Sequence, residues 1–331
     1  MNKSKLPRIV ILGTGGTIAS TAPSSTALTD YSVTEGIDSL LTAVPEIASL
    51  ARIGGEQLFN IESFAITNKM LLKMATRVNQ LLADPDIDGI VITHGTDTLE
   101  ESAYFLNLTV KSHKPVVLVG AMRPGSAISA DGPFNLYNAV LLAAHPQASH
   151  LGVLVALNDR IVAARFVSKT NTTQVDTFRS YEQGCIGHIN NQQVHLYQTP
   201  TRLHTTQTDF DTSATKALPS VDIIYDHQNA GLHFYEASIA AGAQGIVVAA
   251  CGNGSLSPQA RKGARLAVKH KVICVRSSRV GSGIVSASVN DARQRLVSAN
   301  SLNPQKARIL LMLALSVTGD LAQIQSYFDR Y

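Results

Sequence analysis

Near its beginning the chain reads RIVILGTGGT over residues 8–17, where an apolar run of strand length passes directly into a glycine-rich turn. Apolar runs of similar length recur at Gly89 to Thr93, Pro115 to Gly120 and Leu151 to Leu157, with helix-period segments between them. Strands that alternate with helices in this way are typical of a parallel sheet covered on both faces. The pattern predicts a doubly wound, mainly parallel α/β sheet.

Two helices can be placed within this first region. After Thr67 the apolar residues keep to one helical face until Pro85, which predicts an amphipathic helix that ends there. A second helix is expected after Thr98, because the spacing of Thr98 to Glu101 matches the T-x-x-E capping box. The side chain of Thr98 is therefore expected to cap that helix.

The length of 331 residues favours two domains. Residues 198–219 are rich in Thr, Asp, Gln and Pro and predict a linker. It would join a larger N-terminal catalytic domain, residues 1–197, to a smaller C-terminal α/β domain, residues 220–331. In the second domain we expect strands near Asp222–Tyr225, Gly245–Ala249 and Val272–Arg276, and helices near Pro258–Lys269 and Pro304–Val317.

Composition excludes several classes of protein. The net charge of +4 is modest, and basic residues are not interleaved with aromatic ones, so nucleic acid is not an expected partner. No apolar run approaches the roughly 20 residues of a membrane span. The three cysteines, Cys185, Cys251 and Cys274, are widely spaced and are expected to be buried small hydrophobes rather than disulfide or zinc partners. No metal-binding motif is present, so no metal is expected.

The glycine-rich turn is the first candidate site, because ligands of open parallel sheets bind beyond the carboxyl ends of the strands. A dinucleotide fingerprint would need Gly or Ala where Ile18 stands, and the Gly-Lys-Ser/Thr ending of a phosphate loop is missing. The turn is expected to present Thr17 to a small substrate. A purely structural tight turn is the alternative.

The second candidate turn follows Gly89 to Thr93 and places a hydroxyl beside a carboxylate, at Thr96 and Asp97. A threonine hydroxyl needs an adjacent base to act, and a lysine can supply one when burial lowers its pKa. Lys169 is the candidate, although a lysine taken alone is more often solvated. His94 is interpreted as hydrogen-bonded structure and is given no catalytic role.

Several segments together resemble the bacterial type II L-asparaginase and glutaminase-asparaginase family. The similarity covers nearly the whole chain and implies an amidohydrolase that needs no cofactor. The segments are Thr14 to Ala19, Thr93 to Glu101, Gly120 to Pro124, Ser129 to Pro133 and Leu302 to Arg308.

The resemblance implies catalytic roles for five residues. Thr17 would be the nucleophile, and Tyr31, carried on a mobile loop, would activate it. Thr96 would activate or position water, Lys169 would act with Thr96, and Asp97 would bind the α-amino group of the substrate.

The resemblance also implies substrate-binding residues. Ser63 would bind the α-carboxylate, Gly16 and Phe64 would line the site with Thr96 and Asp97, and Asn253 would come from a neighbouring subunit. The expected assembly is therefore a homotetramer with its sites between paired subunits.

Three departures from the family pattern stand out. Phe64 occupies a position that carries Gln or Glu in many members, and Ser112 stands where one cysteine of the family's disulfide would be. The segment Ser277 to Asn290 lacks the Glu that usually reaches into the partner's site. Asp291 is the nearby acidic residue.

The expected function is hydrolysis of L-asparagine to aspartate and ammonia. The alternatives are a glutaminase-asparaginase, a non-catalytic amino-acid-binding protein, and an asparaginase-like subunit of a tRNA-dependent amidotransferase. That last class carries an additional domain ahead of the first motif, where this sequence has about a dozen residues. No secretory signal precedes the first strand, so the cytoplasm is expected, or the periplasm if the start is a mature or engineered one.

Overall fold

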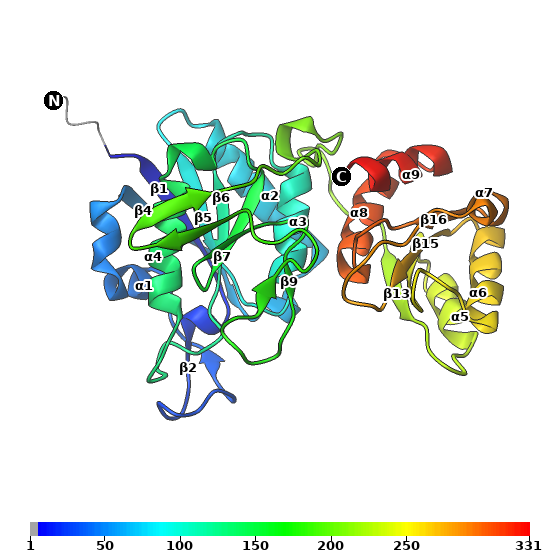
Figure 1. Ribbon diagram of the computed structural model, residues 1–331, viewed down its shortest axis with the longest axis horizontal. Coiled ribbons are helices and arrows are strands. Elements are labelled where there is room, and N and C mark those ends of the chain that lie inside the picture. Colours follow the sequence, from blue (N-terminus) through cyan, green and yellow to red (C-terminus); the bar gives the residue numbers. More distant parts are fainter. Residues whose placement is uncertain (1–5) are drawn as a thin grey trace. The chain divides into compact units, whose positions relative to one another are not determined.

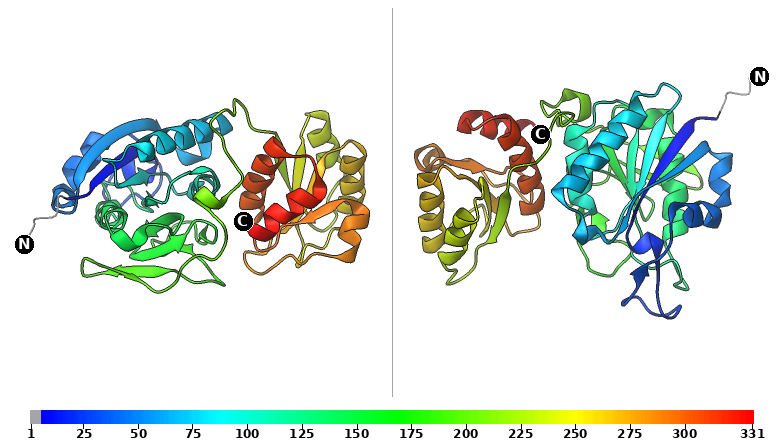
Figure 2. Two further views of the ribbon diagram at one scale, coloured as in Figure 1. Left: turned by 90° about the horizontal axis from the view of Figure 1, so that it is seen from above. Right: turned by 180° about the vertical axis from the view of Figure 1, so that it is seen from behind.

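The computed structural model describes residues 6–331, and the chain divides into two compact units between Thr208 and Asp209. Each unit is built around a sheet of its own with helices packed on it, as Figure 1 and Figure 2 show. The division falls inside residues 198–219, where the linker is expected. The domain limits given above stay a prediction.

The N-terminal unit is organised by an eight-stranded sheet in the order β12-β11-β8-β7-β6-β5-β1-β4 among the described residues. The strands from β4 to β7 run parallel, whereas β8, β11 and β12 extend the sheet antiparallel. The mainly parallel sheet expected from the sequence is confirmed. Its strands are β1 (Arg8–Gly15), β4 (Arg52–Ile61), β5 (Gly89–Thr93), β6 (Val116–Val119), β7 (Val153–Leu157), β8 (Arg160–Ala163), β11 (Gly187–Asn190) and β12 (Gln193–Leu196).

Helices cover both faces of this sheet (Figure 1). α1 (Ile37–Ala43) and α4 (Gly132–Ala143) pack on one face, and their apolar residues share a core with β1, β5 and β6. α2 (Asn68–Ala83) and α3 (Leu99–Thr109) lie over the other face. The hydroxyl of Thr67 accepts from the amide of Met70 at the start of α2, and the helix ends before Pro85 as predicted. No helix among residues 6–331 is long and apolar enough to cross a membrane.

Shorter elements complete the N-terminal unit. β2 pairs with β3 and β9 with β10 in small antiparallel ribbons, and several single turns are 3-10 helices. These elements are β2 (Ser20–Thr21), β3 (Ser32–Val33), β9 (Ser168–Lys169), β10 (Phe178–Arg179), η1 (Thr17–Ala19), η2 (Pro45–Ser49), η3 (Ser63–Ala65), η4 (Pro146–Ala148) and η5 (Thr205–Gln207).

Hydrogen bonds hold the last residue of the N-terminal unit, Thr208, against the rest of that unit. The ammonium of Lys111 donates to the carbonyl and the hydroxyl oxygen of Thr208, at 2.8 and 2.9 Å. The hydroxyl of Thr208 donates in turn to the carbonyl of Leu108 on α3. Part of the segment that reads as a linker is therefore packed onto the first unit, which explains why the division falls after Thr208.

The C-terminal unit has a parallel sheet in the order β13-β14-β15-β16. Apolar residues of α5 and α6 form a core with β13, β14 and β15, and α8 and α9 complete the unit (Figure 1). α6 and α8 have the expected bounds. The elements are β13 (Val221–Tyr225), β14 (Gly245–Ala250), β15 (Ile273–Ser278), β16 (Leu296–Ser298), α5 (His233–Ala240), α6 (Pro258–Lys269), α7 (Val289–Gln294), α8 (Pro304–Val317) and α9 (Leu321–Arg330).

An aromatic cluster joins the two ends of the C-terminal unit. The ring of Phe210 packs edge-on against Tyr327 and Tyr331, with centroids 5.1 and 5.3 Å apart, and all three side chains are buried. The amide of Asp209 donates to the hydroxyl oxygen of Tyr331 at 3.0 Å. The first and last residues of this unit therefore share one core.

The expected burial of the cysteines is only partly right. Cys274 is buried, and loss of solvation raises the pKa of its thiol to about 12. Cys185 and Cys251 are half-buried instead, because Cys185 lies beside the exposed His188 and Cys251 lies in a bridged turn with Ser255. All three are free thiols.

Candidate active site

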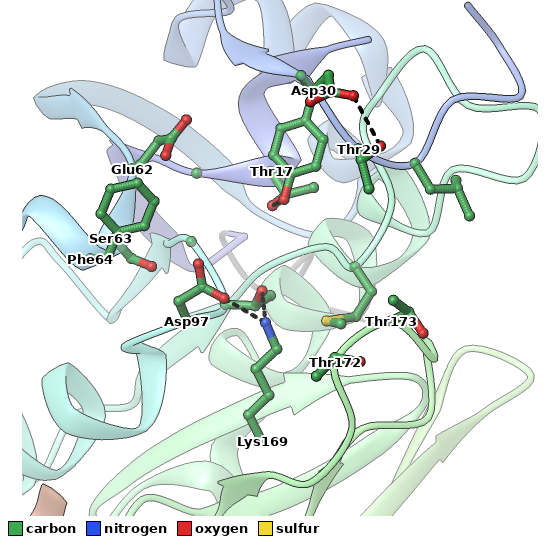
Figure 3. Close-up of a pocket in the computed structure, with 16 residues that line it drawn as sticks. Thr17, Thr29, Asp30, Glu62, Ser63, Phe64, Asp97, Lys169, Thr172 and Thr173 are labelled. Atoms are coloured by element: carbon green, nitrogen blue, oxygen red, sulfur yellow. Dashed lines mark hydrogen bonds and ion pairs between the residues drawn. The ribbon is translucent and has the colours of Figure 1, made fainter.

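A pocket of about 340 Å³ opens beyond the carboxyl ends of β1, β4 and β5 (Figure 3). This is the edge at which parallel sheets bind ligands. The residues that line it come from the ends of these strands, from the turn after β6, from the loop between β2 and β3, and from β9 and the loop after it. They are Gly16, Thr17, Leu28, Thr29, Asp30, Tyr31, Glu62, Ser63, Phe64, Gly95, Thr96, Asp97, Met122, Lys169, Thr172 and Thr173.

Glycines let the strand ends approach closely at the base of the pocket. Gly16 has a φ of 82°, and a β-carbon there would lie 2.3 Å from the amide nitrogen of Gly95. Gly15 has a φ of 95°, and its β-carbon would lie 2.5 Å from the backbone of Ile61 on β4. Only glycine fits both conditions. The close approach brings the turn that carries Thr17 and the turn that carries Thr96 into one site.

Thr17 is the first residue of η1 and its side chain is almost fully buried. Its hydroxyl donates to the hydroxyl oxygen of Tyr31 at 3.0 Å. Tyr31 precedes β3 in the loop that folds back over the turn. The geometry gives the Thr17 oxygen a polar neighbour that can receive its proton during attack on an electrophilic carbon.

Lys169 reaches the pocket from β9, where it pairs with Phe178 of β10. Its ammonium donates to the hydroxyl oxygen of Thr96 at 3.0 Å and to a carboxylate oxygen of Asp97 at 2.7 Å. The side chain of Lys169 is 17% exposed and that of Asp97 is 55% exposed, so the pair lies at the mouth of the pocket. The structure thus brings together the threonine, the carboxylate and the lysine that the sequence suggested as a group.

Ser63 is held at the base of the pocket by Thr98. The amide of Thr98 donates to the hydroxyl oxygen of Ser63 at 3.3 Å, and the hydroxyl of Thr98 donates to the Ser63 carbonyl at 2.8 Å. Because the Ser63 oxygen accepts here, its own proton can be donated to a bound carboxylate.

These two bonds correct the expectation for Thr98. Thr98 occupies the position before α3, but its side chain makes no capping hydrogen bond. The prediction was wrong because the hydroxyl is committed to Ser63, which lies far away in sequence. Thr98 therefore supports the pocket, a role that the capping-box pattern concealed.

The side chain of His94 is hydrogen-bonded at both ring nitrogens, as the sequence suggested. It is fully buried, its Nδ1 donates to the Gly95 carbonyl at 2.7 Å, and its Nε2 accepts from the Ser102 hydroxyl at 2.8 Å. Burial lowers the pKa of its imidazole to about 4. A neutral imidazole with both nitrogens occupied fixes the turn that carries Thr96.

Phe64 lines the pocket from η3 and is 67% exposed. Glu62, just before η3, also lines the pocket and was not among the residues expected from the sequence. It belongs to no motif, and only the pairing of β4 with β1 brings it to the site.

Asn253 and Asp291 lie in the C-terminal unit, where both line a pocket of about 440 Å³. Asn253 exchanges hydrogen bonds with Ser286, at 2.7 and 3.2 Å. The carboxylate of Asp291 accepts from the guanidinium of Arg276 at 2.6 and 2.8 Å and from the amide of Ser288 at 2.7 Å. Asp291 is thus committed to the structure of its own unit.

No group of three or more His, Cys, Asp or Glu residues in the described part of the chain is arranged to hold a metal ion. The polar side chains that line the pocket of the N-terminal unit carry hydroxyl groups, one amine and carboxylates. Such a set is suited to nucleophilic attack on an acyl carbon and to the recognition of a small zwitterion.

Family models match both units of the chain. Residues 8–202 match the model described as Asparaginase, N-terminal, and residues 220–328 match the model described as Glutaminase/Asparaginase C-terminal domain. The L-asparaginase 2 of Bacillus subtilis is 56% identical over 99% of this chain and 88% of its own length. The glutaminase-asparaginase of Pseudomonas fluorescens is 43% identical over 99% of this chain and 92% of its own length.

A solved structure is similar throughout. The crystal structure of a probable cytoplasmic L-asparaginase from Campylobacter jejuni matches 98% of this chain and 100% of its own chain. The TM-score is 0.96 and the sequence identity is 48%. The similarity extends over both units.

Proposed function

The chain belongs to the asparaginase family and is an L-asparaginase, and we propose that it hydrolyses the side-chain amide of L-asparagine with Thr17 as the nucleophile. The observation that carries this assignment is the 3.0 Å hydrogen bond from the Thr17 hydroxyl to Tyr31 at the base of the pocket. In the first step the Thr17 oxygen bonds to the amide carbon. The carbon–nitrogen bond breaks, and the Thr17 proton leaves with the nitrogen as ammonia.

In the second step water adds to the resulting ester. The ester bond breaks, Thr17 regains a proton from the water, and aspartate leaves. The contact of the Lys169 ammonium with Thr96 supports a role for this pair in positioning the water. Tyr31, by its contact with Thr17, is assigned the transfer of the Thr17 proton.

The zwitterionic end of the substrate is assigned to the other side of the pocket. The Ser63 hydroxyl would donate to the α-carboxylate, and the free oxygen of Asp97 would accept from the α-ammonium. Gly16 and Phe64 complete the wall. Asn253 would be supplied by a second subunit, in a homotetramer with sites between paired subunits.

The test of this function is ammonia release by the purified protein from L-asparagine, L-glutamine and their D forms. We expect turnover of L-asparagine, and we expect Thr17→Ala to reduce kcat by about a thousandfold or more. Mass spectrometry of acid-quenched enzyme should find an aspartyl ester on the peptide that contains Thr17. Near-normal turnover by Thr17→Ala would show that another group attacks the amide carbon. If the wild-type protein releases no ammonia from any of these amides, only a binding function remains.

Hydrolysis of L-glutamine is the second candidate activity. It is favoured by the similarity to a protein named as a glutaminase-asparaginase. The same steps apply to a side chain one methylene longer, and the ratio of kcat/KM for the two amides measures the preference.

We also assign the protein to the cytoplasm, supported by the similarity to a structure titled as a probable cytoplasmic L-asparaginase. Cell fractionation with a periplasmic marker enzyme tests this. Recovery of the activity with the periplasmic marker would overturn the assignment.

A further inference from the structure

We propose that Glu62 binds the α-ammonium group of the substrate, as a second acidic ligand beside Asp97. The inference rests on the proposed function, because it assigns one more residue to the same pocket. Glu62 directly follows β4 and directly precedes Ser63, and both residues line the pocket. In Figure 3 Glu62, Ser63, Phe64 and Asp97 occupy the same side of the pocket.

The charges that line the pocket leave one carboxylate without a partner. Asp97 is paired with Lys169 at 2.7 Å, and Asp30 accepts from the hydroxyl of Thr29 at 3.3 Å. Within residues 6–331 the half-buried carboxylate of Glu62 has no hydrogen-bond or ion-pair partner. A partly desolvated carboxylate without a partner favours the binding of a cation. The acidic side chains Asp30, Glu62 and Asp97 outnumber the single lysine of the pocket.

Glu62 and Ser63 are adjacent in the chain, just as the two charged groups that they would bind are adjacent in an α-amino acid. The α-carboxylate and the α-ammonium share one carbon atom, so their ligands must be close neighbours. Ser63 can donate to the carboxylate, and the adjacent Glu62 can accept from the ammonium. No other pair of consecutive residues lining this pocket offers a hydroxyl donor beside a carboxylate without a partner.

The other residues near this position are less suited to the task. Phe64 offers only the face of a ring, and such contacts contribute about 0.5 to 2 kcal/mol. Asp97 already shares its charge with Lys169. Asp291, the acidic residue that the sequence suggested as a substitute, is bound by Arg276 and Ser288 in the C-terminal unit.

The test compares Glu62→Gln with the wild-type enzyme on two substrates. The first is L-asparagine, and the second is succinamate, which differs only in lacking the α-amino group. Glutamine keeps the size of the side chain but removes the charge. We expect the ratio of kcat/KM for asparagine to kcat/KM for succinamate to fall about tenfold, with the loss on asparagine appearing mainly in KM.

Glu46→Gln is the matched control, since Glu46 is exposed on η2 and does not line the pocket. Its ratio should equal that of the wild type. Glu62→Asp keeps the charge and should retain a higher ratio than Glu62→Gln, so the two variants separate a loss of charge from a disturbed fold. An unchanged ratio in Glu62→Gln, or an equal loss on both substrates, would overturn the proposal.

The outcome can be distinguished from a failure of the proposed function. If the wild-type protein releases no ammonia from asparagine, the function itself is wrong. If the wild type is active and the ratio does not respond to Glu62→Gln, the function stands and Glu62 has no part in ammonium recognition.

Discussion

Gly16 and Gly95 are in direct backbone contact, so that a β-carbon on Gly16 would lie 2.2 Å from the Cα of Gly95. This contact sets the distance between the turn that carries Thr17 and the turn that carries Thr96. Neither backbone segment can shift without moving Thr17 or Thr96.

We therefore expect Gly16→Ala to reduce kcat/KM by about a hundredfold or more, since displacements of about 1 Å have effects of that size on catalysis. The control is Gly184→Ala, because Gly184 also has a positive φ, of 71°, but nothing lies within 4 Å of its β-carbon position. Both substitutions introduce backbone strain, because both glycines have a positive φ. The difference between their kcat/KM values, measured by steady-state kinetics, therefore gives the steric effect of the added methyl group at Gly16. Equal losses in the two variants would refute a specific role for the contact.

Lys169→Met should slow turnover by about a hundredfold or more, the usual contribution of a positioned proton-transfer group. The melting temperature should change little, because the side chain contacts Thr96 and Asp97 at the pocket mouth rather than the core. Lys262→Met, at an exposed position of α6, is the control. A wild-type rate in Lys169→Met would remove the lysine from the mechanism.

Phe64→Gln should lower the KM for L-asparagine by about tenfold, because an amide oxygen can accept from the substrate ammonium and one such bond contributes about 1.5 kcal/mol. Phe134→Gln serves as the control, since Phe134 is similarly exposed on α4 outside the pocket. Steady-state kinetics on asparagine provide the measurement. A KM that stays the same or rises would mean that the ammonium already has all its acceptors.

Light scattering should find a tetramer, and subunit mixing can test whether Asn253 completes the site of a partner. Thr17→Ala and Asn253→Ala should each be nearly inactive as pure assemblies. Refolding an equal mixture should restore about a quarter of the wild-type sites, because random pairing places an intact Thr17 opposite an intact Asn253 in that fraction. Failure to regain activity, or a fully active monomer, would contradict sites shared between subunits.

The burial of His94 predicts a loss of stability in mild acid. The folded protein protonates this imidazole only near pH 4, whereas the unfolded chain does so near its ordinary pKa of 6.5. The unfolded state therefore binds more protons between these values, and stability falls as the pH drops from about 6.5 to about 4.

Between pH 7 and pH 5 the contribution of His94 is about 2 kcal/mol. Urea unfolding at both pH values, for wild type and His94→Asn, gives the comparison. The variant should lose less stability on acidification, because the other histidines contribute equally to both proteins. An identical loss would show that His94 titrates normally.

The sequence predicted the centre of the sheet better than its edges. The apolar run at Gly89–Thr93 coincides with β5, because a central strand buries every residue. β4, at Arg52–Ile61, was not predicted, because an edge strand is only partly buried and this one contains Gly54 and Gly55. The short antiparallel strands β8, β11 and β12 were not predicted either.

Pocket residues that lie in the turn directly after a strand could be predicted from the sequence. Residues whose role depends on hydrogen bonds or strand pairing between distant segments could not. Thr17, Thr96 and Lys169 were found from the turns and the resemblance, and the structure places them in one pocket. Thr98 was misread because a local pattern suggested a cap, whereas its hydroxyl bonds a residue 35 positions away. Glu62 was missed because only the register of β4 against β1 brings it to the pocket.

The contact of Phe210 with Tyr331 has a consequence for how the protein is made. The C-terminal unit cannot complete its core until Tyr331 has left the ribosome, because the residues that begin the unit pack on those that end it. The N-terminal unit, by contrast, has its full set of strands once Thr208 has emerged. Synthesis therefore favours a fixed order, in which the first unit folds on the ribosome and the second closes only after Tyr331 has emerged.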